Sequence, residues 1–213
     1  MSEPMRRLPV YLVLDCSGSM AGEPIEAVRQ GMRALVADLR GNPQALETAY
    51  LSVLTFAGNA VQACPLTELM AFQEPTLAAG GSTSLGAGLR LLQQSVEAEV
   101  KKPGADQKGD WKPLVFLMTD GKPTDRWEAA ADEIKAKGIV NVIACAAGSG
   151  ADASLLKRIT PTVVELNNLQ PETLKAFFQW VSSSIKTTSQ KIAAQGAAPV
   201  ALPPPPPQIV VVP

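Results

Sequence analysis

The chain has 213 residues, of which 46% are apolar and 18% are charged, and its formal net charge is −1. Such a composition is typical of one large or two small globular domains, and the interspersed charges exclude a basic nucleic-acid-binding face. No run reaches the ~18 apolar residues of a membrane span and no signal-peptide pattern is present, so we expect a cytoplasmic protein with neither nucleic-acid nor membrane partners.

Strand and helix patterns alternate from the start of the chain. A continuous apolar run at 9–15 predicts a strand buried on both faces. Apolar residues at three- and four-residue spacing then predict a helix that begins at Pro24 and ends before a glycine and an Asn-Pro pair. Residues 49–56 predict a second strand. A Gly-Asn turn predicts a shorter antiparallel strand at 60–64, which we expect Pro65 to end.

The middle of the chain repeats this alternation. Residues 66–82 end in two glycines and predict a surface loop. Leucine and valine spacing predicts a helix over 84–102, which a polar loop at 103–111 follows. Residues 114–120 predict a third buried strand, and we expect the next helix over 123–137.

The last third predicts two more strands and a final helix. The strands lie at 139–147 and 162–166 with a short helix between them, and an amphipathic helix covers about 171–187. An Ala- and Pro-rich composition follows, and its PPPPP run favours polyproline II. We therefore expect a domain over 1–188 and a flexible, partly extended tail over 189–213, outside the core.

The alternation of helices with continuous apolar strands predicts the fold class. We expect an α/β domain with a doubly wound, mostly parallel sheet, one antiparallel edge strand and helices on both faces. In such sheets ligands bind at the carboxyl ends of the strands, where successive connections diverge to opposite faces.

Three polar clusters fall at predicted strand ends or helix starts. Asp15, Ser17 and Ser19 directly follow the first strand, Thr83 lies in a Gly-rich loop before a helix, and Asp120 directly follows the third buried strand. Glycines within these clusters allow the backbone to approach a ligand closely. The sequence therefore predicts that these five side chains form one site.

The ligand type follows from the atoms that the sequence offers and lacks. Histidine is absent, and the three cysteines are too widely spaced for a disulfide framework or a CxxC zinc site. Ser-His-Asp and Cys-His catalysis are thereby excluded. Two carboxylates and several hydroxyls suit a hard divalent cation such as Mg²⁺, Mn²⁺ or Ca²⁺. Such sparse negative charge would leave the metal electrophilic, so we expect it to attract a carboxylate from outside.

Other polar residues lie near these clusters in the sequence. We interpret Glu23, Ser84 and Asp125 as helix N-terminal and capping residues rather than ligands. We expect Cys16 to face the packed interior.

The three clusters resemble the metal-ion-dependent adhesion site of von Willebrand factor A domains, and the resemblance covers about residues 8–188. It implies that Ser17, Ser19 and Thr83 ligate Mg²⁺ directly, while Asp15 and Asp120 act largely through water. It also implies that an Asp or Glu of a partner protein completes the coordination, in a binding module without catalytic residues.

Within this family the segments RRLPVYLVLDCSGSM and GGSTSLG look most similar to bacterial tellurium-resistance TerY-like proteins. That resemblance implies an intracellular role in tellurium resistance or the stress response, with a kinase-like protein or a phosphatase as partner.

An enzyme remains the alternative reading. Aspartyl-phosphate phosphatases also place their nucleophile after a first strand, so Asp15 could serve a metal-dependent phosphotransfer reaction. Those enzymes usually carry a second aspartate two residues later, where this chain has Ser17. Neither a P-loop nor a GxGxxG fingerprint is present, which argues against nucleotide-binding enzymes.

Overall fold

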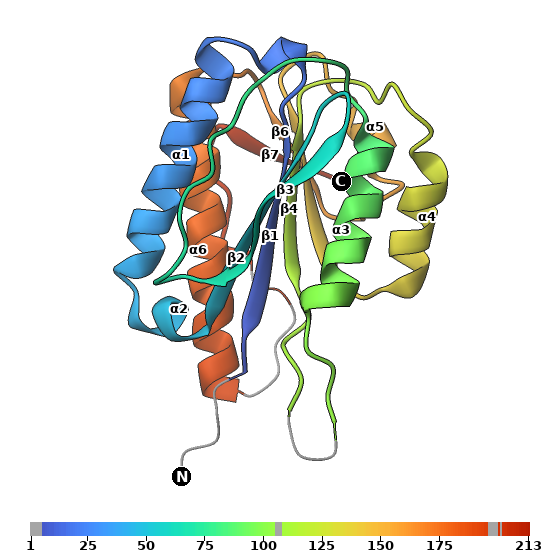
Figure 1. The fold of residues 1–213 in the computed structure, drawn as a ribbon. Coiled ribbons are helices and arrows are strands. Elements are labelled where there is room, and N and C mark those ends of the chain that lie inside the picture. The colour runs from blue at the N-terminus through green and yellow to red at the C-terminus, as the bar shows by residue number, and fades with distance from the viewer. Residues whose placement is uncertain (1–5, 105–107, 196–199, 201) are drawn as a thin grey trace.

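A seven-stranded sheet forms the centre of the computed structural model, which describes residues 6–104, 108–195, 200 and 202–213 (Figure 1). Its strands are β1 (Leu8–Asp15), β2 (Ala49–Phe56), β3 (Ala60–Glu68), β4 (Leu114–Thr119), β5 (Asn141–Ala147), β6 (Val163–Leu166) and β7 (Ile209–Val212). Across the sheet the order is β3-β2-β1-β4-β5-β6-β7. The chain thus winds outward from β1 in one direction and then, from β4, in the other.

Helices cover both faces of this sheet (Figure 1). They are α1 (Glu23–Arg40), α2 (Pro43–Thr48), α3 (Leu85–Glu99), α4 (Glu128–Lys137), α5 (Ala153–Leu156), α6 (Pro171–Gln195) and the 3₁₀ turn η1 (Gly18–Met20). On one face α1 and α2 pack against α6, and on the other α3 packs against α4. None of the helices in the described part of the chain is long and apolar enough to cross a membrane.

The central strands are parallel and buried, as their continuous apolar runs predict. Every residue of β1 and β4 is buried, and β1 lies parallel to both β2 and β4. Successive side chains of a strand point to opposite faces, so Leu12 and Leu14 enter the core beneath α1 and α6, whereas Tyr11 and Val13 enter the core beneath α3 and α4. The predicted α/β, doubly wound and mostly parallel class is confirmed.

The predicted antiparallel edge strand is β3, and it is longer than expected. It continues past Pro65 to Glu68, with an irregular register opposite Val53. Because β3 is the edge strand, a proline that lacks an N–H can face outward without breaking a ladder hydrogen bond.

The C-terminal segment differs from expectation, because part of it joins the sheet. α6 runs to Gln195, beyond the predicted boundary at residue 188, and β7 adds a second antiparallel edge beside β6. Ile209 is buried, and the indole N–H of Trp180 donates to the Pro203 carbonyl over 2.9 Å. The described part of the 189–213 tail is therefore packed on the domain, since β6 offers it an open edge that the linear sequence does not reveal.

Candidate metal centre

The predicted site residues meet at the carboxyl end of the sheet. Asp15 is the last residue of β1 and Asp120 follows β4, and these two strands are adjacent and parallel, so they end side by side. Ser17 and Ser19 lie in the turn that follows β1. Thr83 approaches from the loop before α3, where its Oγ1 lies 3.3 Å from the place a Cβ on residue 121 would take. The structure thus brings all five residues into one place.

Asp15 is fixed by its neighbours on both carboxylate oxygens. Its side chain is fully buried, and Oδ1 accepts the Ser17 backbone N–H at 2.8 Å. Oδ2 accepts the Thr119 hydroxyl at 2.6 Å. Asp15 is consequently held in one orientation, and the hydroxyl of Thr119, which is not among the five predicted ligands, helps to hold it.

The remaining polar atoms form a short chain of hydrogen bonds. The Oγ atoms of Ser17 and Ser19 lie 3.1 Å apart, and Ser19 Oγ donates to Asp120 Oδ1 over 2.9 Å. A hydroxyl whose proton points to a carboxylate keeps its lone pairs free for a cation. This arrangement fits serines as direct metal ligands, with the aspartate behind them.

The electrostatics of the site favour a bound cation. Burial, followed by the nearby charge of Asp15, raises the pKa of Asp120 above its ordinary value. Neither aspartate forms an ion pair with any described residue. Two buried carboxylates without a cationic partner are unfavourable, and a divalent ion would relieve that repulsion.

The donor set is one that a hard metal prefers. Among the described residues no group of three or more His, Cys, Asp or Glu side chains could hold a metal, and the side-chain donors gathered at this place are two carboxylates and three hydroxyls. Cys16 is buried, as expected, and burial raises the pKa of its thiol to about 12.

Backbone hydrogen bonds place Thr83 against the other two loops. Gly80 N–H donates to the Cys16 carbonyl at 2.8 Å, and Gly18 N–H donates to the Gly81 carbonyl at 2.9 Å. Gly81 has a φ of 81°, and a Cβ there would lie 3.0 Å from Gly58 N, so glycine is required. The Gly-rich loop predicted from the sequence thus serves close backbone approach.

The loop that carries Thr83 starts at the far end of the sheet. β3 ends at Glu68, which pairs with Tyr50 near the start of β2, and residues 69–82, here called the strap, return to the carboxyl end (Figure 1). Three of its side chains are buried in the core: Leu69, Phe72 and Leu77. The strap is therefore an anchored segment that delivers one of the candidate ligands.

Three arginines of α1 hold the strap from outside, a feature that sequence reasoning missed. Their contacts are Arg40 Nε to Leu69 O (3.0 Å), Arg40 Nη2 to Phe72 O (2.6 Å), Arg33 Nε to Glu74 Oε2 (3.3 Å) and Arg29 to the Leu77 carbonyl. Arginines on the exposed side of a helix carry no local signal for such contacts. Only the path of the strap reveals them.

Asp125 is a capping residue, as interpreted, but it caps a different helix from the one expected. Its two carboxylate oxygens accept the N–H groups of Gly86 and Ala87 at 2.9 Å each, at the start of α3. α4 begins only at Glu128, later than predicted. Thr124 N–H also donates to the Thr83 carbonyl at 2.9 Å. The segment after Asp120 therefore hydrogen-bonds directly to the residue that bears the third hydroxyl ligand candidate.

The other two capping predictions fare differently. Glu23 lies in the first turn of α1, as expected. Ser84 occupies the N-cap position of α3 without a capping hydrogen bond from its side chain, and its hydroxyl instead lies 3.4 Å from the Gly58 carbonyl oxygen.

One curated protein is similar in sequence to most of this chain. Human inter-alpha-trypsin inhibitor heavy chain H6 is 25% identical over 172 residues, which is 74% of this chain but 12% of that protein. The chain thus spans about an eighth of the length of that relative.

Solved structures share the fold. Proximal thread matrix protein 1 from the mussel byssus, in a structure described as having a zinc-occupied MIDAS motif, is 24% identical with a TM-score of 0.64, covering 86% of this chain and 48% of that one. A von Willebrand factor type A protein from Catenulispora acidiphila is 18% identical with a TM-score of 0.65, covering 85% of this chain and 43% of that one.

The von Willebrand factor type A domain model matches residues 10–180, a span that runs from within β1 into the first part of α6 and holds all five candidate ligands. The sheet order, the meeting of three loops at its carboxyl end and this match agree with one another. The chain belongs to the von Willebrand factor type A domain family, a family of metal-dependent protein-interaction modules.

Proposed function

We propose that this protein is a metal-dependent interaction module whose cation is held by Ser17, Ser19 and Thr83 directly and by Asp15 and Asp120 through water. The observation that carries the proposal is the hydrogen-bonded series from Ser17 through Ser19 to Asp120, beside a buried Asp15. The two serine hydroxyls keep lone pairs available beside two carboxylates that form no ion pair with a described residue.

Mg²⁺ is the proposed ion, with Mn²⁺ or Ca²⁺ as alternatives, because every candidate ligand is an oxygen atom. Two carboxylates acting through water would leave the ion with residual positive charge. A partner's Asp or Glu would complete the coordination, and the ion would then bridge the two proteins.

Binding is favoured over catalysis by the state of Asp15. Both of its oxygens accept hydrogen bonds at 2.8 Å or less, and the residue two positions later is Ser17 rather than a second acid. A phosphoryl-transfer nucleophile needs a free oxygen and a nearby acid or base. We therefore propose a module without catalytic residues.

The cellular setting is proposed from the sequence. The opening segment and the GGSTSLG loop support a TerY-like protein that acts in the cytoplasm in tellurium resistance or the stress response. We propose a kinase-like protein or a phosphatase as partner, with residues 1–188 as the binding unit and 189–213 as an addition to it.

The metal site is tested by a matched pair of variants in one loop. Thr83→Ala removes a candidate ligand, whereas Ser82→Ala removes an exposed hydroxyl next to it. We expect Thr83→Ala to weaken Mg²⁺ binding in calorimetry at least tenfold, and Ser82→Ala to leave it unchanged. Equal Mg²⁺ affinity in the two variants would contradict the assignment of Thr83.

The bridging role needs a separate measurement with defined partners. Purified kinase-like and phosphatase candidates would be tested for capture on the immobilised protein in Mg²⁺ and in EDTA. We expect capture that is lost in EDTA and in Thr83→Ala. Capture that survives both treatments would place the partner surface elsewhere on the molecule.

A further inference from the structure

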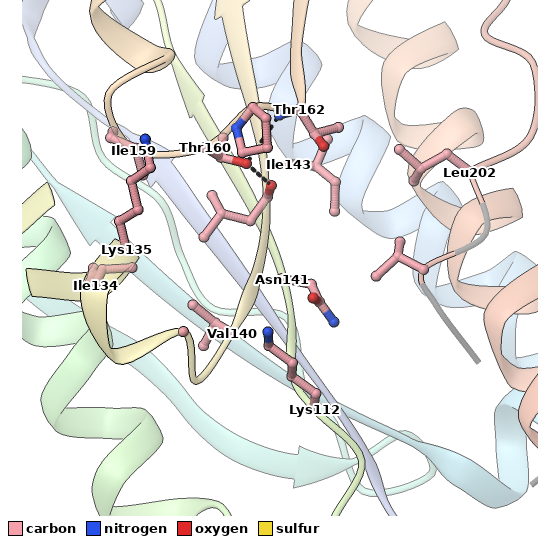
Figure 2. Close-up of a pocket in the computed structure, with 14 residues that line it drawn as sticks. Lys112, Ile134, Lys135, Val140, Asn141, Ile143, Ile159, Thr160, Thr162 and Leu202 are labelled. Carbon is pink, nitrogen blue, oxygen red and sulfur yellow. Dashed lines mark hydrogen bonds between the residues drawn. The ribbon is translucent and has the colours of Figure 1, made fainter. Parts of the chain in front are cut away.

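A pocket of about 390 Å³ lies at the opposite end of the sheet from the candidate metal centre, where β5 begins (Figure 2). The end of α4 and the loop before β6 form two of its walls, and Val200 and Leu202 of the C-terminal segment form another. Its volume falls within the range of ~300–1,000 Å³ that small-molecule sites occupy.

The pocket exists because β6 is shorter than β5. β6 pairs with β5 only from Ala144 onward, so no strand covers the outer edge of β5 before that residue. Asn141 N–H donates to the Pro113 carbonyl on the β4 side, so the peptide groups of Val142 face the open side. The Thr160 hydroxyl donates to the Val142 carbonyl at 2.7 Å, but the Val142 N–H has no acceptor among the described residues.

The charged side chains among the described lining residues of this pocket are all positive. Lys112 and Lys135 reach toward the pocket from two sides (Figure 2), and the described lining residues include no aspartate or glutamate. Neither lysine forms an ion pair or hydrogen bond with a described residue through its ammonium group. Asp132, whose field reaches Lys135, is already bound by Arg158 at 2.5 Å.

Another lysine of α4, Lys137, forms ion pairs and can be compared with the two pocket lysines. Lys137 of α4 binds Glu97 at 2.7 Å and Glu133 at 3.1 Å. The two pocket lysines thus differ from Lys137 in having no carboxylate within bonding distance, although the chain as a whole carries a net charge of −1.

The rest of the lining is apolar or hydrogen-bonding. Val140, Ile143 of β5 and Leu202 supply apolar lining, and the side-chain amide of Asn141 lies near Lys112 (Figure 2). A ligand that matches these groups has one anionic end and an apolar body.

We propose that this pocket binds a small amphiphilic anion. Its carboxylate or phosphate group lies in the field of Lys112 and Lys135 and accepts the free N–H of Val142, while its hydrocarbon part packs on Val140 and Leu202. The site does not involve the metal centre, and it uses the C-terminal segment as a wall.

The test uses the full chain in EDTA, so that no carboxylate can bind through a metal ion. Decanoate and decyl phosphate are the anionic probes, decanol is the uncharged probe, and decyltrimethylammonium is the cationic one. We expect saturable calorimetric binding of an anion at least tenfold tighter than of decanol, with a shift of the Val142 amide resonance. The stronger of the two anions identifies the head group.

Charge variants then tie the binding to the pocket. Lys112→Gln with Lys135→Gln should weaken the anion at least tenfold, and Lys137→Gln, the matched control on α4, should not. All three substitutions are at the surface, and unfolding midpoints will verify that each variant folds. Leu202→Glu offers an independent check, because a carboxylate in the wall should repel the anion.

Three results would overturn the proposal. The first is binding of decanol or decyltrimethylammonium as tight as that of the stronger anion. The second is equal weakening by Lys137→Gln and by the double variant, and the third is failure of both anions to saturate below about 1 mM.

Discussion

The two ends of the sheet each hold a buried aspartate, and the two aspartates differ in whether a cationic side chain pairs with them. At the amino end Asp110, whose side chain is 3% exposed, binds Arg7 at 2.5 Å and accepts the Lys101 N–H at 2.7 Å. At the carboxyl end Asp120 is also buried, but its described partners are hydroxyl and backbone groups, and its pKa is raised. The first acid is fully satisfied and the second is not. Incomplete pairing of a buried charge therefore marks the candidate functional end.

The difference follows from the parallel topology. All the parallel strands end together at the carboxyl edge, so loops from distant parts of the chain meet there and bring polar groups with them. The amino edge is closed instead by contacts within the domain. Arg6 stacks on Trp111 at 3.8 Å, and Arg7 lies over the Tyr50 ring. Beside β1 the amino end is closed by ionic and stacking contacts, whereas the carboxyl end gathers polar groups that have no ionic partner among the described residues.

We expect the largest loss of stability when the buried ion pair between Arg7 and Asp110 is removed. Arg7→Met leaves the buried Asp110 carboxylate without its cation, which should lower the free energy of unfolding by about 3–5 kcal/mol. Urea denaturation measures the loss. Arg33→Met, which removes an exposed ion pair of 3.3 Å, should cost less than about 1 kcal/mol. Similar losses in both variants would erase the proposed distinction between structural and surface pairs.

Gly86→Ala tests the packing between the loops of the carboxyl end. A Cβ at this position would lie 2.6 Å from the Arg126 carbonyl oxygen and 2.8 Å from Trp127 Cα, so backbone must move. We expect a loss of about 1–3 kcal/mol in urea denaturation, together with weaker Mg²⁺ binding as the segment after Asp120 shifts. Gly80→Ala has open space around its Cβ and serves as the control. Unchanged Mg²⁺ affinity in Gly86→Ala would show that the loop packing does not tune the site.

Asp120→Asn should have opposite effects on stability and binding. Replacing the carboxylate should stabilise the metal-free protein, because burial and the nearby charge of Asp15 both raise the pKa of Asp120. The same variant should lose the rise in unfolding temperature that Mg²⁺ gives to the wild type. Thermal unfolding in EDTA and in Mg²⁺ measures both effects. A destabilised metal-free variant would mean that Asp120 is structurally satisfied after all.

The smallest effect concerns a half-exposed acid outside the candidate site. Asp38 Oδ2 accepts the Lys186 ammonium at 2.7 Å and the Ser182 hydroxyl at 2.6 Å, which lowers the pKa of Asp38. A lowered folded-state pKa stabilises above the unfolded value of ~3.9, and that stability is lost as pH falls through the folded value. Asp38→Asn should cost about 0.5 kcal/mol near neutrality, and the two proteins should converge in acid. A pH-independent difference in urea denaturation would point to packing rather than charge.

The sequence predicted the central architecture well because it is encoded locally. Continuous apolar runs such as 9–15 and 114–120 can only be buried on both faces, and that burial implies parallel strands covered by helices. The same runs fix which residues stand at strand ends, and so the co-location of Asp15 and Asp120 could be predicted. That these residues hold a metal stays a prediction, which the Thr83→Ala experiment addresses.

Contacts between remote segments could not be predicted. The α1 arginines, the choice of α3 as the helix that Asp125 caps, and the pairing of β7 with β6 each join residues that are far apart in the sequence. These contacts leave no periodic pattern in the sequence, because each depends on the position of a sheet edge or a helix start in the folded chain.

The sequence by itself determined the buried strands, the helices that cover them and the oxygen-bearing residues at the strand ends, because hydrophobic periodicity and residue chemistry are local properties. The tertiary structure alone decided that Asp110 pairs with Arg7 while Asp120 pairs with no arginine or lysine in the described part of the chain, and that a lysine-lined pocket opens beside β5. Pairing and desolvation depend on distances between side chains, and only the folded chain sets those distances.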